Sequence, residues 1–511
     1  MDTGTQPTVL ITGAGPAGLF AACELVRHGV RPRILERRTA PHGETRGTII
    51  QPAVLEMIER GGLIEPFLQA GVRVRRVHLL GPGFTEIAVS SFAGIGSPYE
   101  FQLSLPQWRT EAILREHLAG LGVAIEFGTE VVAVEDDPDG LRVTLEAGGR
   151  TEVTAAAYVL GAGGAHGILR RSMHETLAGE TYDGRYIVAD ARLALPCPPE
   201  CGRVIVGPEG FALLSPLPDG RSLIFVNRDE ADTRAGPPTE AELGALVDRR
   251  AGVAVGLHDL AWVSYFRMHR REVARLGDGR RFLLGDAGHL SSPLGGEGIN
   301  AAFMDAADIA WKLALVLRGA ARPSLLDSYA VERGAADHHV LEVSDEIHDF
   351  VMGLVAMCEG GGTPAVPPAD PAKRRATARR RSMLDVSYAG SALVGGAGAD
   401  VAGLSPGERF PAHHRLAGTG HHLVVLGEAP HPGPVGQFGP AGQFGRRWGD
   451  HLSVVAAADA GLDAAAAGLP GGSAILVRPD GFVGFRAVPA DAATLAALDA
   501  HLETYLVPAE A

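Results

Sequence analysis

The stretch TVLITGAGPAGLFAACELVRHGVRPRILERR, residues 8–38, decides the fold of this chain. A short apolar strand gives way to a helical pattern, and a second strand ends at Glu36. Gly13, Gly15 and Gly18 occupy the turn between the first strand and the helix. The first glycine permits a tight turn, the second lets a pyrophosphate approach the backbone, and the third allows the helix to pack closely. The pattern predicts a Rossmann-type dinucleotide-binding unit.

The start of that helix is a candidate phosphate site, because its amide groups are unpaired and lie at the positive end of the helix dipole. The candidate contacts there are Gly13, Gly15, Pro16, Ala17 and Gly18. Glu36, followed by Arg37, lies where a carboxylate accepts hydrogen bonds from ribose hydroxyl groups. An acid at this position favours FAD or NAD over NADP, whose 2′-phosphate it would repel.

A second glycine-rich stretch, GDAGHLSSPLGGEGIN at residues 285–300, also follows a short strand and also starts a helix. A flat ring can approach backbone amides closely only where no side chain intervenes, so these glycines suit a planar ligand. Amides at the helix start would also stabilise negative charge on that ligand. A single ligand with two ends explains why the chain returns to the same site far downstream of the first motif.

Both motifs, and the segments ETRGTIIQPAVLEMIERGGL and LSLPQWRTEAILREHLAG between them, resemble those of the single-component FAD-dependent aromatic hydroxylases. The resemblance runs from residue 8 to about residue 355 and implies a para-hydroxybenzoate hydroxylase-like fold. It implies that Asp286 holds the ribityl chain of FAD, that Arg46 lies near the pyrophosphate and that Gln107 meets the flavin chain. Against the isoalloxazine ring it places Pro293, Gly296, Gly298, Ile299 and Asn300. We expect His289 and Pro293 near the ring, and no residue is assigned as catalytic.

One motif departs from the family pattern. Similar proteins carry an Asp-Gly pair after the strand AAAYVLGAGG, and here Gly163 stands where the Asp would be, while Gly164 and Arg170 remain. In the family, that Asp is associated with the binding of both FAD and the reduced nicotinamide. Its absence bears on the use of NADPH or NADH as reductant more than on FAD binding.

The predicted fold class is α/β, with a Rossmann-type FAD-binding domain of the GR2-like kind, an interleaved β-sheet substrate domain and a thioredoxin-like C-terminal domain. The FAD-binding domain is expected to be discontinuous and to take residues 1–75, 107–175 and 271–360. The substrate-binding sheet is expected to take residues 76–106 and 176–270.

The hairpin GFALLSPLPDGRSLIFVN lies in that sheet, with Pro-Asp-Gly as its turn signal. Alternation makes Phe211, Leu213 and Phe225 candidate pocket residues, although packing in the core explains each of them equally well. Further on, residues 361–398 contain KRRATARRR and are rich in Gly and Pro, which predicts a solvated linker. Residues 399–511 resemble the thioredoxin-like domain of aromatic polyketide hydroxylases, but they contain no cysteine, which excludes disulfide chemistry there.

Composition excludes several classes of function. A net charge of -14 argues against a nucleic-acid partner, whose phosphates the surface would repel. Four cysteines in 511 residues do not form a disulfide framework, and the CPPEC turn at Cys197 and Cys201 suits a surface loop, so no metal site is expected. The apolar runs are too short to span a membrane, and no signal peptide precedes the first strand, so we expect a cytoplasmic protein, monomeric or homodimeric.

The sequence and the resemblance together predict an FAD-dependent monooxygenase that uses NADPH or NADH and O2. The expected substrate is a polycyclic aromatic phenol of polyketide type, hydroxylated through a flavin C4a-hydroperoxide in the biosynthesis of a secondary metabolite such as an antibiotic. Two enzymatic alternatives stay open, a Baeyer–Villiger oxygenase on the same fold and, because of Gly163, an FAD-dependent dehydrogenase that inserts no oxygen. A flavin-bound binding or chaperone protein is a third alternative.

Overall fold

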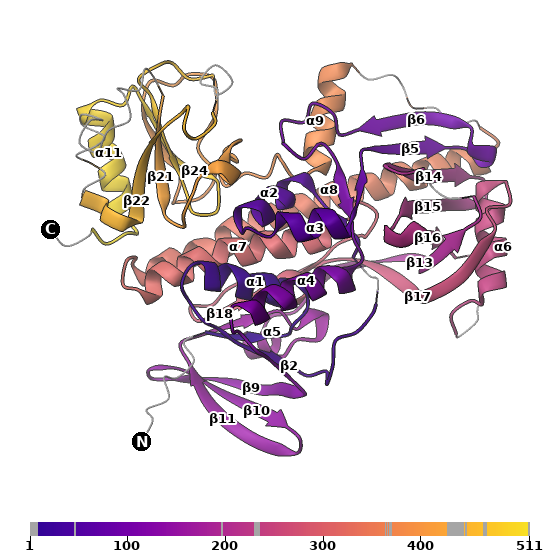
Figure 1. Cartoon of the computed structure of the whole chain (residues 1–511), viewed down its shortest axis with the longest axis horizontal. Helices are drawn as coiled ribbons and strands as arrows, with labels where there is room; N and C mark the ends of the chain where they lie inside the picture. Colours follow the sequence, from indigo (N-terminus) through magenta and orange to yellow (C-terminus); the bar gives the residue numbers. More distant parts are fainter. Residues whose placement is uncertain are drawn as a thin grey trace.

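The structure of the chain is a computed structural model. The residues that it describes are 9–44, 47–195, 198–228, 236–362, 364, 366, 370–426, 444, 447–462 and 468–508. Figure 1 shows a broad sheet and a C-terminal α/β region at opposite ends of the molecule, with α1 (Pro16–Arg27) and α7 (Gly298–Leu317) between them. None of the described helices is long and apolar enough to cross a membrane.

A five-stranded parallel sheet forms the centre and confirms the Rossmann-type fold. Its strands, in spatial order, are β18 (Arg281–Leu283), β12 (Tyr158–Gly161), β1 (Val9–Thr12), β2 (Arg33–Glu36) and β8 (Ile125–Phe127). Because the strands are parallel, their carboxyl ends meet at one edge, where ligands of such sheets bind. The turns after β1, β12 and β18 therefore converge although they are far apart in sequence.

Close packing of α1 on β1 depends on two glycines. Gly13 has φ +103°, and a Cβ atom added at Gly18 would lie 2.0 Å from the carbonyl oxygen of Gly13. On the other side of α1, Phe20 stacks on Phe303 of α7 with ring centroids 4.2 Å apart. The third glycine of the motif thus allows the helix–strand contact, as its spacing predicts.

Smaller elements complete this central region. Its further helices are α2 (Pro52–Arg60), α3 (Ile64–Ala70), α4 (Gln107–Gly120) and α5 (Ile168–Ser172). One three-stranded sheet has the order β3 (Ile49–Ile50), β7 (Gln102–Ser104) and β4 (Val72–Val74). Another has the order β11 (Arg150–Ala156), β10 (Gly140–Ala147) and β9 (Thr129–Asp137).

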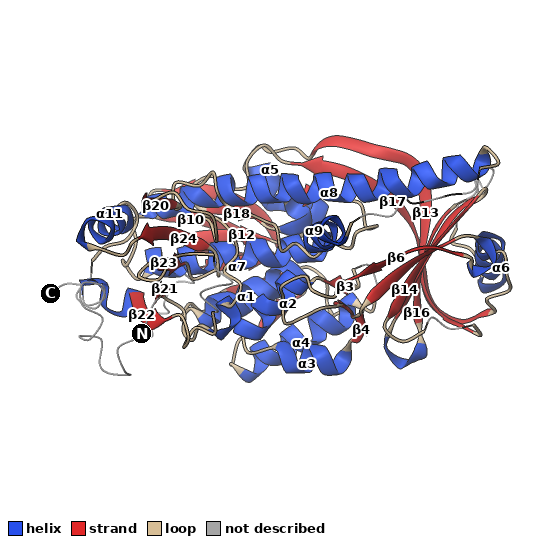
Figure 2. Cartoon of the chain, turned by 90° about the horizontal axis from the view of Figure 1, so that it is seen from above, coloured by secondary structure: helices blue, strands red, loops and turns tan. Residues whose placement is uncertain are grey.

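The broad sheet has eight strands and is mostly antiparallel. Its spatial order is β19 (His289–Leu290), β17 (Leu257–Glu272), β13 (Ala178–Leu193), β16 (Ser222–Asn227), β15 (Gly210–Pro216), β14 (Cys201–Gly207), β5 (Arg76–Leu80) and β6 (Glu86–Ser91). The expected hairpin is β15–β16, with Leu213 opposite Phe225. Helix α6 (Glu240–Ala251) packs on one face, and the long helix α8 (Asp327–Glu359) reaches the other (Figure 2).

The C-terminal region is a mixed five-stranded sheet with α11 (Ala492–Glu503) packed beside it. Its strand order is β20 (Gly395–Gly398), β24 (Val483–Val488), β23 (Ala474–Val477), β21 (His421–Val425) and β22 (Leu452–Ala456). Because β20 pairs with β24, this sheet already begins inside residues 361–398, the segment predicted as a linker.

The prediction that KRRATARRR is a linker is wrong, because this tract forms helix α9 (Pro371–Arg381), although residues 373–377 are exposed as predicted. The side chain of Asp370 caps the helix by accepting a hydrogen bond from the Lys373 amide at 2.9 Å, and proline occupies its first turn. Ala378 is buried, and Arg379 donates to the carbonyl oxygen of Ile95 at 2.6 Å. The capping Asp370 and the proline after it are helix-start signals in the sequence, but the high arginine content of the tract favoured a solvated segment instead.

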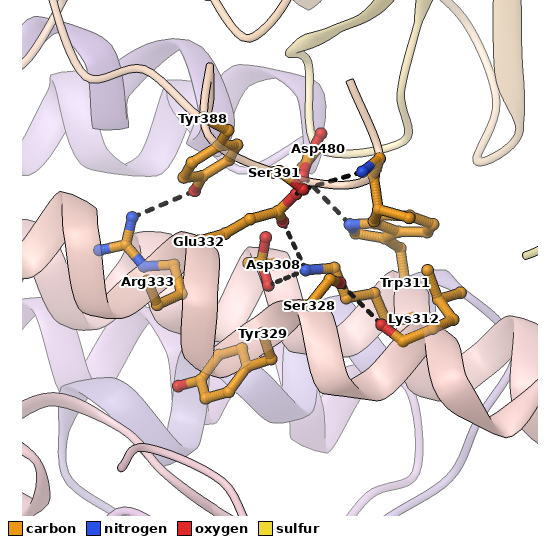
Figure 3. A network of polar contacts seen from close by, with 12 residues as sticks. Asp308, Trp311, Lys312, Ser328, Tyr329, Glu332, Arg333, Tyr388, Ser391 and Asp480 are labelled. Carbon is orange, nitrogen blue, oxygen red and sulfur yellow. Dashed lines mark hydrogen bonds and ion pairs between the residues drawn. The ribbon is translucent and has the colours of Figure 1, made fainter. Parts of the chain in front are cut away.

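A buried network of charges joins the C-terminal region to α7 and α8 (Figure 3). The Nζ atom of Lys312 lies 2.6 Å from both Asp308 and Glu332. Arg478, which follows β23, donates from Nη2 to Glu332 Oε2 at 2.8 Å and also pairs with Asp480. All five side chains are almost completely buried. The two cations neutralise most of the charge of the three carboxylates, which makes this cluster a clamp between domains.

We expect Lys312→Met to lower the free energy of unfolding by about 3–5 kcal/mol, because it leaves the three buried carboxylates with Arg478 as the single remaining cation of the cluster. Urea denaturation followed by tryptophan fluorescence measures the change. The matched control is Arg142→Met, which breaks the exposed ion pair with Glu135 and should cost about 1 kcal/mol or less. Equal effects of the two substitutions would contradict the assignment of Lys312 as the centre of the clamp.

Candidate functional site

A cavity of about 2580 Å³ lies between the carboxyl edge of the parallel sheet and the eight-stranded sheet. Ordinary ligand pockets measure roughly 300–1,000 Å³, so this central cavity has room for a dinucleotide and a second ligand. We call the part lined by the turns of the parallel sheet the dinucleotide end. The part lined by β5, β6, β13–β17, α8 and α9 is called the sheet end.

The first glycine motif lines the dinucleotide end. The lining residues from the motif and from the end of β2 are Gly13, Gly15, Pro16, Ala17, Glu36 and Arg37. A Cβ atom added at Gly15 would meet nothing within 4 Å, so the backbone there is open to the cavity. Gly18 does not line the cavity and serves the packing of α1 instead. These residues fit a phosphate-bearing cofactor, which would approach bare backbone at the start of a helix.

Two backbone amides hold the carboxylate of Glu36 in the cavity wall. Its Oε2 atom accepts a hydrogen bond from the Ala14 amide at 2.8 Å, and Oε1 accepts one from the Arg38 amide at 2.9 Å. The turn after β1 is therefore tied to the end of β2. This contact presents a preoriented acceptor to any ligand bound at the dinucleotide end.

The second glycine motif lines the middle of the cavity. From it, the lining includes Asp286, Pro293, Gly296, Gly298 and Ile299. Gly296 has φ +71°, and a Cβ atom added there would lie 2.8 Å from Ile49 Cβ. A glycine is therefore required at this point both by the backbone conformation and by the approach of β3.

Asn300 does not line the cavity, in contrast to the expectation that it lies against the ring. Its Oδ1 atom accepts from the Gln51 amide at 2.8 Å, and its Nδ2 atom donates to the carbonyl oxygens of Ile49 and Gly296 at 2.9 and 2.7 Å. All of these contacts are made within the protein. Asn300 thus fixes the glycine loop to β3 and α2 from behind.

Gln107 lines the cavity at the start of α4. Its Oε1 atom accepts from the Gly47 amide at 3.1 Å, and its Nε2 atom donates to Glu111 at 2.9 Å. The side chain therefore links α4 to the segment before β3. Arg46, the other contact expected in this area, lies outside the described residues.

His289 does not line the cavity, in contrast to the expectation that it lies near the ring. Its Nε2 atom lies 2.8 Å from Asp305 Oδ2 and 3.5 Å from Asp337 Oδ2, and all three side chains are buried. Burial disfavours the charged imidazolium, but Asp337 and Asp305 outweigh burial and raise the pKa of His289 to about 9. Asp305 also accepts from the Gly285 amide and from Arg333 Nε, each at 2.8 Å. His289 therefore belongs to an ion cluster under the loop.

At the sheet end, Leu213 and Phe225 line the cavity and Phe211 does not. Phe211 is fully buried, with its ring 6.1 Å from that of Tyr186 and 5.7 Å from that of Phe225. The alternation of the hairpin places Phe211 on the same face as Leu213. That end of the face is covered by the last turns of α8, and the hairpin sequence alone does not reveal this.

The analysis of the sequence missed several features of the cavity. Trp262 and Phe266 of β17 line the sheet end, together with Lys373, Arg374, Arg375 and Arg381 of α9. The side chain of Glu297 is buried beneath the glycine loop, and neither of its carboxyl oxygens has a hydrogen-bond partner among the described residues. Burial raises the pKa of Glu297 to about 8, so this carboxyl is held neutral at pH 7.

We expect the His289 cluster to make stability depend on pH. The pKa of His289 is raised above the unfolded value of about 6.5, so its contribution is fully present below pH 6.5 and is lost as the pH rises through about 9. His289→Gln should remove much of the loss of stability between pH 7.5 and 9.5, and should lower the melting temperature most near neutral pH. Thermal melts of both proteins across this range measure the effect. The exposed residue His258 provides the control, since His258→Gln should leave the pH profile unchanged.

Two family models match the chain. The model described as "FAD binding domain" matches residues 6–344, and the model described as "Aromatic-ring hydroxylase, C-terminal" matches residues 435–509. A 6-methylpretetramide 4-monooxygenase from Streptomyces rimosus is 34% identical over 446 residues, which cover 84% of this chain and 76% of that protein. A 12-dehydrotetracycline 5-monooxygenase/anhydrotetracycline 6-monooxygenase from S. rimosus subsp. rimosus is 30% identical over 94% of this chain and 95% of its own length.

Among solved structures, an anhydrotetracycline hydroxylase from S. rimosus superposes with a TM-score of 0.75 at 26% identity, over 99% of this chain and 100% of that one. The likeness therefore covers the parallel sheet, the eight-stranded sheet and the C-terminal region together. The cofactor is FAD, as the family model indicates, and the open backbone at Gly15 leaves room for its phosphates. The chain belongs to the FAD-dependent aromatic-ring hydroxylases and is a flavoprotein monooxygenase.

Proposed function

We propose that the protein hydroxylates a polycyclic aromatic phenol of polyketide type in secondary metabolism, with O2 as oxidant and NADPH or NADH as reductant. The single observation that carries this proposal is the central cavity, which runs without interruption from the dinucleotide end to a sheet end lined by aliphatic and aromatic side chains together with basic ones. Its volume of about 2580 Å³ suits FAD together with a multi-ring substrate. The tetracycline monooxygenases to which the chain is similar are named for substrates of this kind.

The proposal assigns a role to each residue that lines the cofactor part of the cavity. Amides of Gly15, Pro16 and Ala17 would bind the phosphates of FAD, with Glu36 and Arg37 at the adenosine side. Asp286 and Gln107 would bind the ribityl chain. The ring would lie on the bare backbone of the loop that carries Pro293, Gly296, Gly298 and Ile299. Arg46 stays a predicted pyrophosphate contact.

Bound FAD supplies electron uptake from the nicotinamide and activation of O2. The chain itself shapes the cavity, excludes water from it and supplies groups that stabilise charge. Leu213, Phe225, Trp262 and Phe266 would orient the aromatic substrate and exclude water from its reacting carbon. Amides at the start of α7 would stabilise negative charge beside the ring. The proton retained by Glu297 would prevent a carboxylate from opposing that effect.

Gly163 bears on the choice of reductant. It lines the cavity in the turn after β12, its φ is -79°, and an added Cβ atom would lie 3.3 Å from Gly167 Cα. The conformation is one that any residue adopts, so the site accepts a side chain with a small adjustment of the Gly167 backbone. We propose that the missing carboxylate weakens the interaction with the reduced nicotinamide and leaves FAD binding intact.

We also propose that the enzyme is a cytoplasmic monomer or homodimer. In the cytoplasm it would have access to the cellular pool of reduced nicotinamide.

The reaction type is tested with ¹⁸O2. Purified FAD-loaded protein, NADPH and a panel of polycyclic phenols should give a product two mass units heavier under ¹⁸O2 than under ¹⁶O2, with the carbon skeleton intact. Insertion of the label beside a ketone carbon, with a ring expanded to a lactone, would identify a Baeyer–Villiger oxygenase instead. Substrate oxidation without label would show that the protein is a dehydrogenase.

The role of Gly163 is tested by Gly163→Asp. We expect the rate of flavin reduction by NADPH under anaerobic conditions to rise about tenfold, because a carboxylate would be restored beside the nicotinamide site. Gly163→Asn is the matched control, since it has the same shape without the charge and should give a smaller increase. Stopped-flow absorbance of the flavin band measures both rates. Unchanged rates in both variants would show that this position does not limit the use of the nicotinamide.

A further inference from the structure

The two ends of the central cavity differ in their acidic residues, whereas cations line both, since Arg37, Arg38, Arg170 and Arg171 belong to the dinucleotide end. The acidic residues that line it all belong to the dinucleotide end or to the segments beside it, and they are Glu36, Glu44, Glu111, Glu130 and Asp286. The described lining of the sheet end contains no Asp or Glu. It does contain Arg203, Arg267 and Arg271 from the sheet. It also contains Lys373, Arg374, Arg375 and Arg381 from α9, and we call these four residues the basic wall. The chain as a whole has a net charge of -14, so this local excess of positive charge differs from the charge of the whole protein.

The arginines of helix α9 have two roles, since some hold the helix against the rest of the protein and others line the cavity. Arg379 donates to the carbonyl oxygen of Ile95, and Arg380 pairs with Glu346 of α8 at 3.0 Å, so these two arginines hold the helix in place. Arg374 and Arg381 are separated by seven residues, or two helical turns, and therefore share another face, which lines the cavity. Among the described residues neither of these two arginines forms a salt bridge, although Glu297 and Glu346 lie close enough to Arg381 to oppose the lowering of its pKa by burial.

Strand β17 carries positive charge as well. His269 of β17 hydrogen-bonds to Thr181 Oγ1 at 2.9 Å. Burial lowers the pKa of His269, and the neighbouring Arg271 and Arg267 lower it further. Arg270 lies between His269 and Arg271 in the sequence and pairs with Asp345 of α8 at 2.5 Å. Arg267, His269 and Arg271 alternate along β17 with Trp262 and Phe266 and therefore point to the other face of the sheet, so the cations beside the aromatic side chains come from α9.

Resting on the proposed hydroxylase function, we propose that the substrate is an aromatic anion whose ionised acidic group, a carboxylate or the enolate of a 1,3-dicarbonyl, is bound by the basic wall. Guanidinium groups suit such planar oxygen pairs because they donate two parallel hydrogen bonds. An anion would also relieve the repulsion among cations that share one cavity. Trp262 and Phe266 would hold the apolar rings, so charge at one end and stacking at the other would fix which carbon faces the flavin.

The test compares two ligands that differ in charge on one scaffold. Rhein is a dihydroxyanthraquinone carboxylic acid, and aloe-emodin carries a neutral hydroxymethyl group at the same position. Equilibrium dialysis of both with the FAD-loaded protein at low ionic strength gives their dissociation constants. We expect wild-type protein to bind rhein at least tenfold more tightly, and 0.5 M KCl to reduce that preference.

Variants assign the preference to the basic wall. The double variant Arg374→Gln, Arg381→Gln should reduce the preference for rhein to less than threefold while leaving the affinity for aloe-emodin within twofold. The matched control is Arg380→Gln, which removes a charge from the same helix at a residue that pairs with Glu346 and does not line the cavity, and should keep the preference. Melting temperatures of the variants, measured in parallel, show whether each remains folded.

Several results would overturn the proposal. These are equal binding of the two ligands, binding of neither ligand, or a loss of the preference for rhein in the Arg380→Gln control that equals the loss in the double variant. NADPH is also an anion, so its dissociation constant is measured with the same variants. A loss of NADPH affinity with an unchanged preference for rhein would assign the basic wall to the reductant. Incorporation of ¹⁸O without any preference for the anion would remove this proposal and leave the hydroxylase function in place. A preference for the anion without incorporation of ¹⁸O would support the role of the basic wall and remove the hydroxylase function.

Discussion

The buried carboxylate of Asp305 is the contact on which the arrangement of the cofactor site depends. It accepts hydrogen bonds from the Gly285 amide and from His289, and it pairs with Arg333 of α8. Asp305 lies on α7, the helix that begins at the second glycine loop, so one side chain ties the turn before that loop to the helix after it. Asp286 and the bare backbone near Gly296 are held at the cavity by this buried anchor.

Helices α7 and α8 also connect the surroundings of Asp305 to the C-terminal region. Arg333 also donates to Tyr388, and one residue earlier Glu332 binds both Lys312 and Arg478. Removing charges from water is costly, so such a network is stable only when every member is paired. The C-terminal sheet therefore has a structural role that needs no cysteine. Its Arg478 and Asp480 meet charged residues of α7 and α8 in a second buried cluster, apart from the one around Asp305.

Charge is also distributed unevenly inside the cavity. The overall composition is acidic, but the charge of a chain and the charge of a cavity wall are independent quantities. Acidic and basic side chains both line the dinucleotide end, whereas the described lining of the sheet end contains basic residues, several of them from α9, and no acidic ones. Because a low-dielectric wall strengthens the field of its own charges, the cations of α9 act on a bound ligand more strongly than the distant acidic surface does. The FAD-binding half and the substrate half thus favour different ligands within one cavity.

The parts of the fold that could be predicted from the sequence are those encoded by local backbone geometry. Gly13 and Gly18 mark a turn in which a side chain would collide with neighbouring backbone, and the strand, helix and acid around them follow with regular spacing. A similar requirement at Gly296 marks the second loop. The cofactor contacts assigned to the lining residues remain predictions, but the position of these residues on a single cavity follows from parallel strands whose carboxyl ends converge.

The sequence by itself therefore determined the Rossmann-type sheet, the two glycine loops and the family to which the chain belongs. Only the tertiary structure decided that His289 and Asn300 face the interior, that α8 covers Phe211, and that α9 supplies arginines to the cavity. The physical reason is the range of the interactions. A glycine responds to its own dihedral angles and to its nearest turn, whereas a buried ion pair or a covered aromatic ring depends on partners tens or hundreds of residues away.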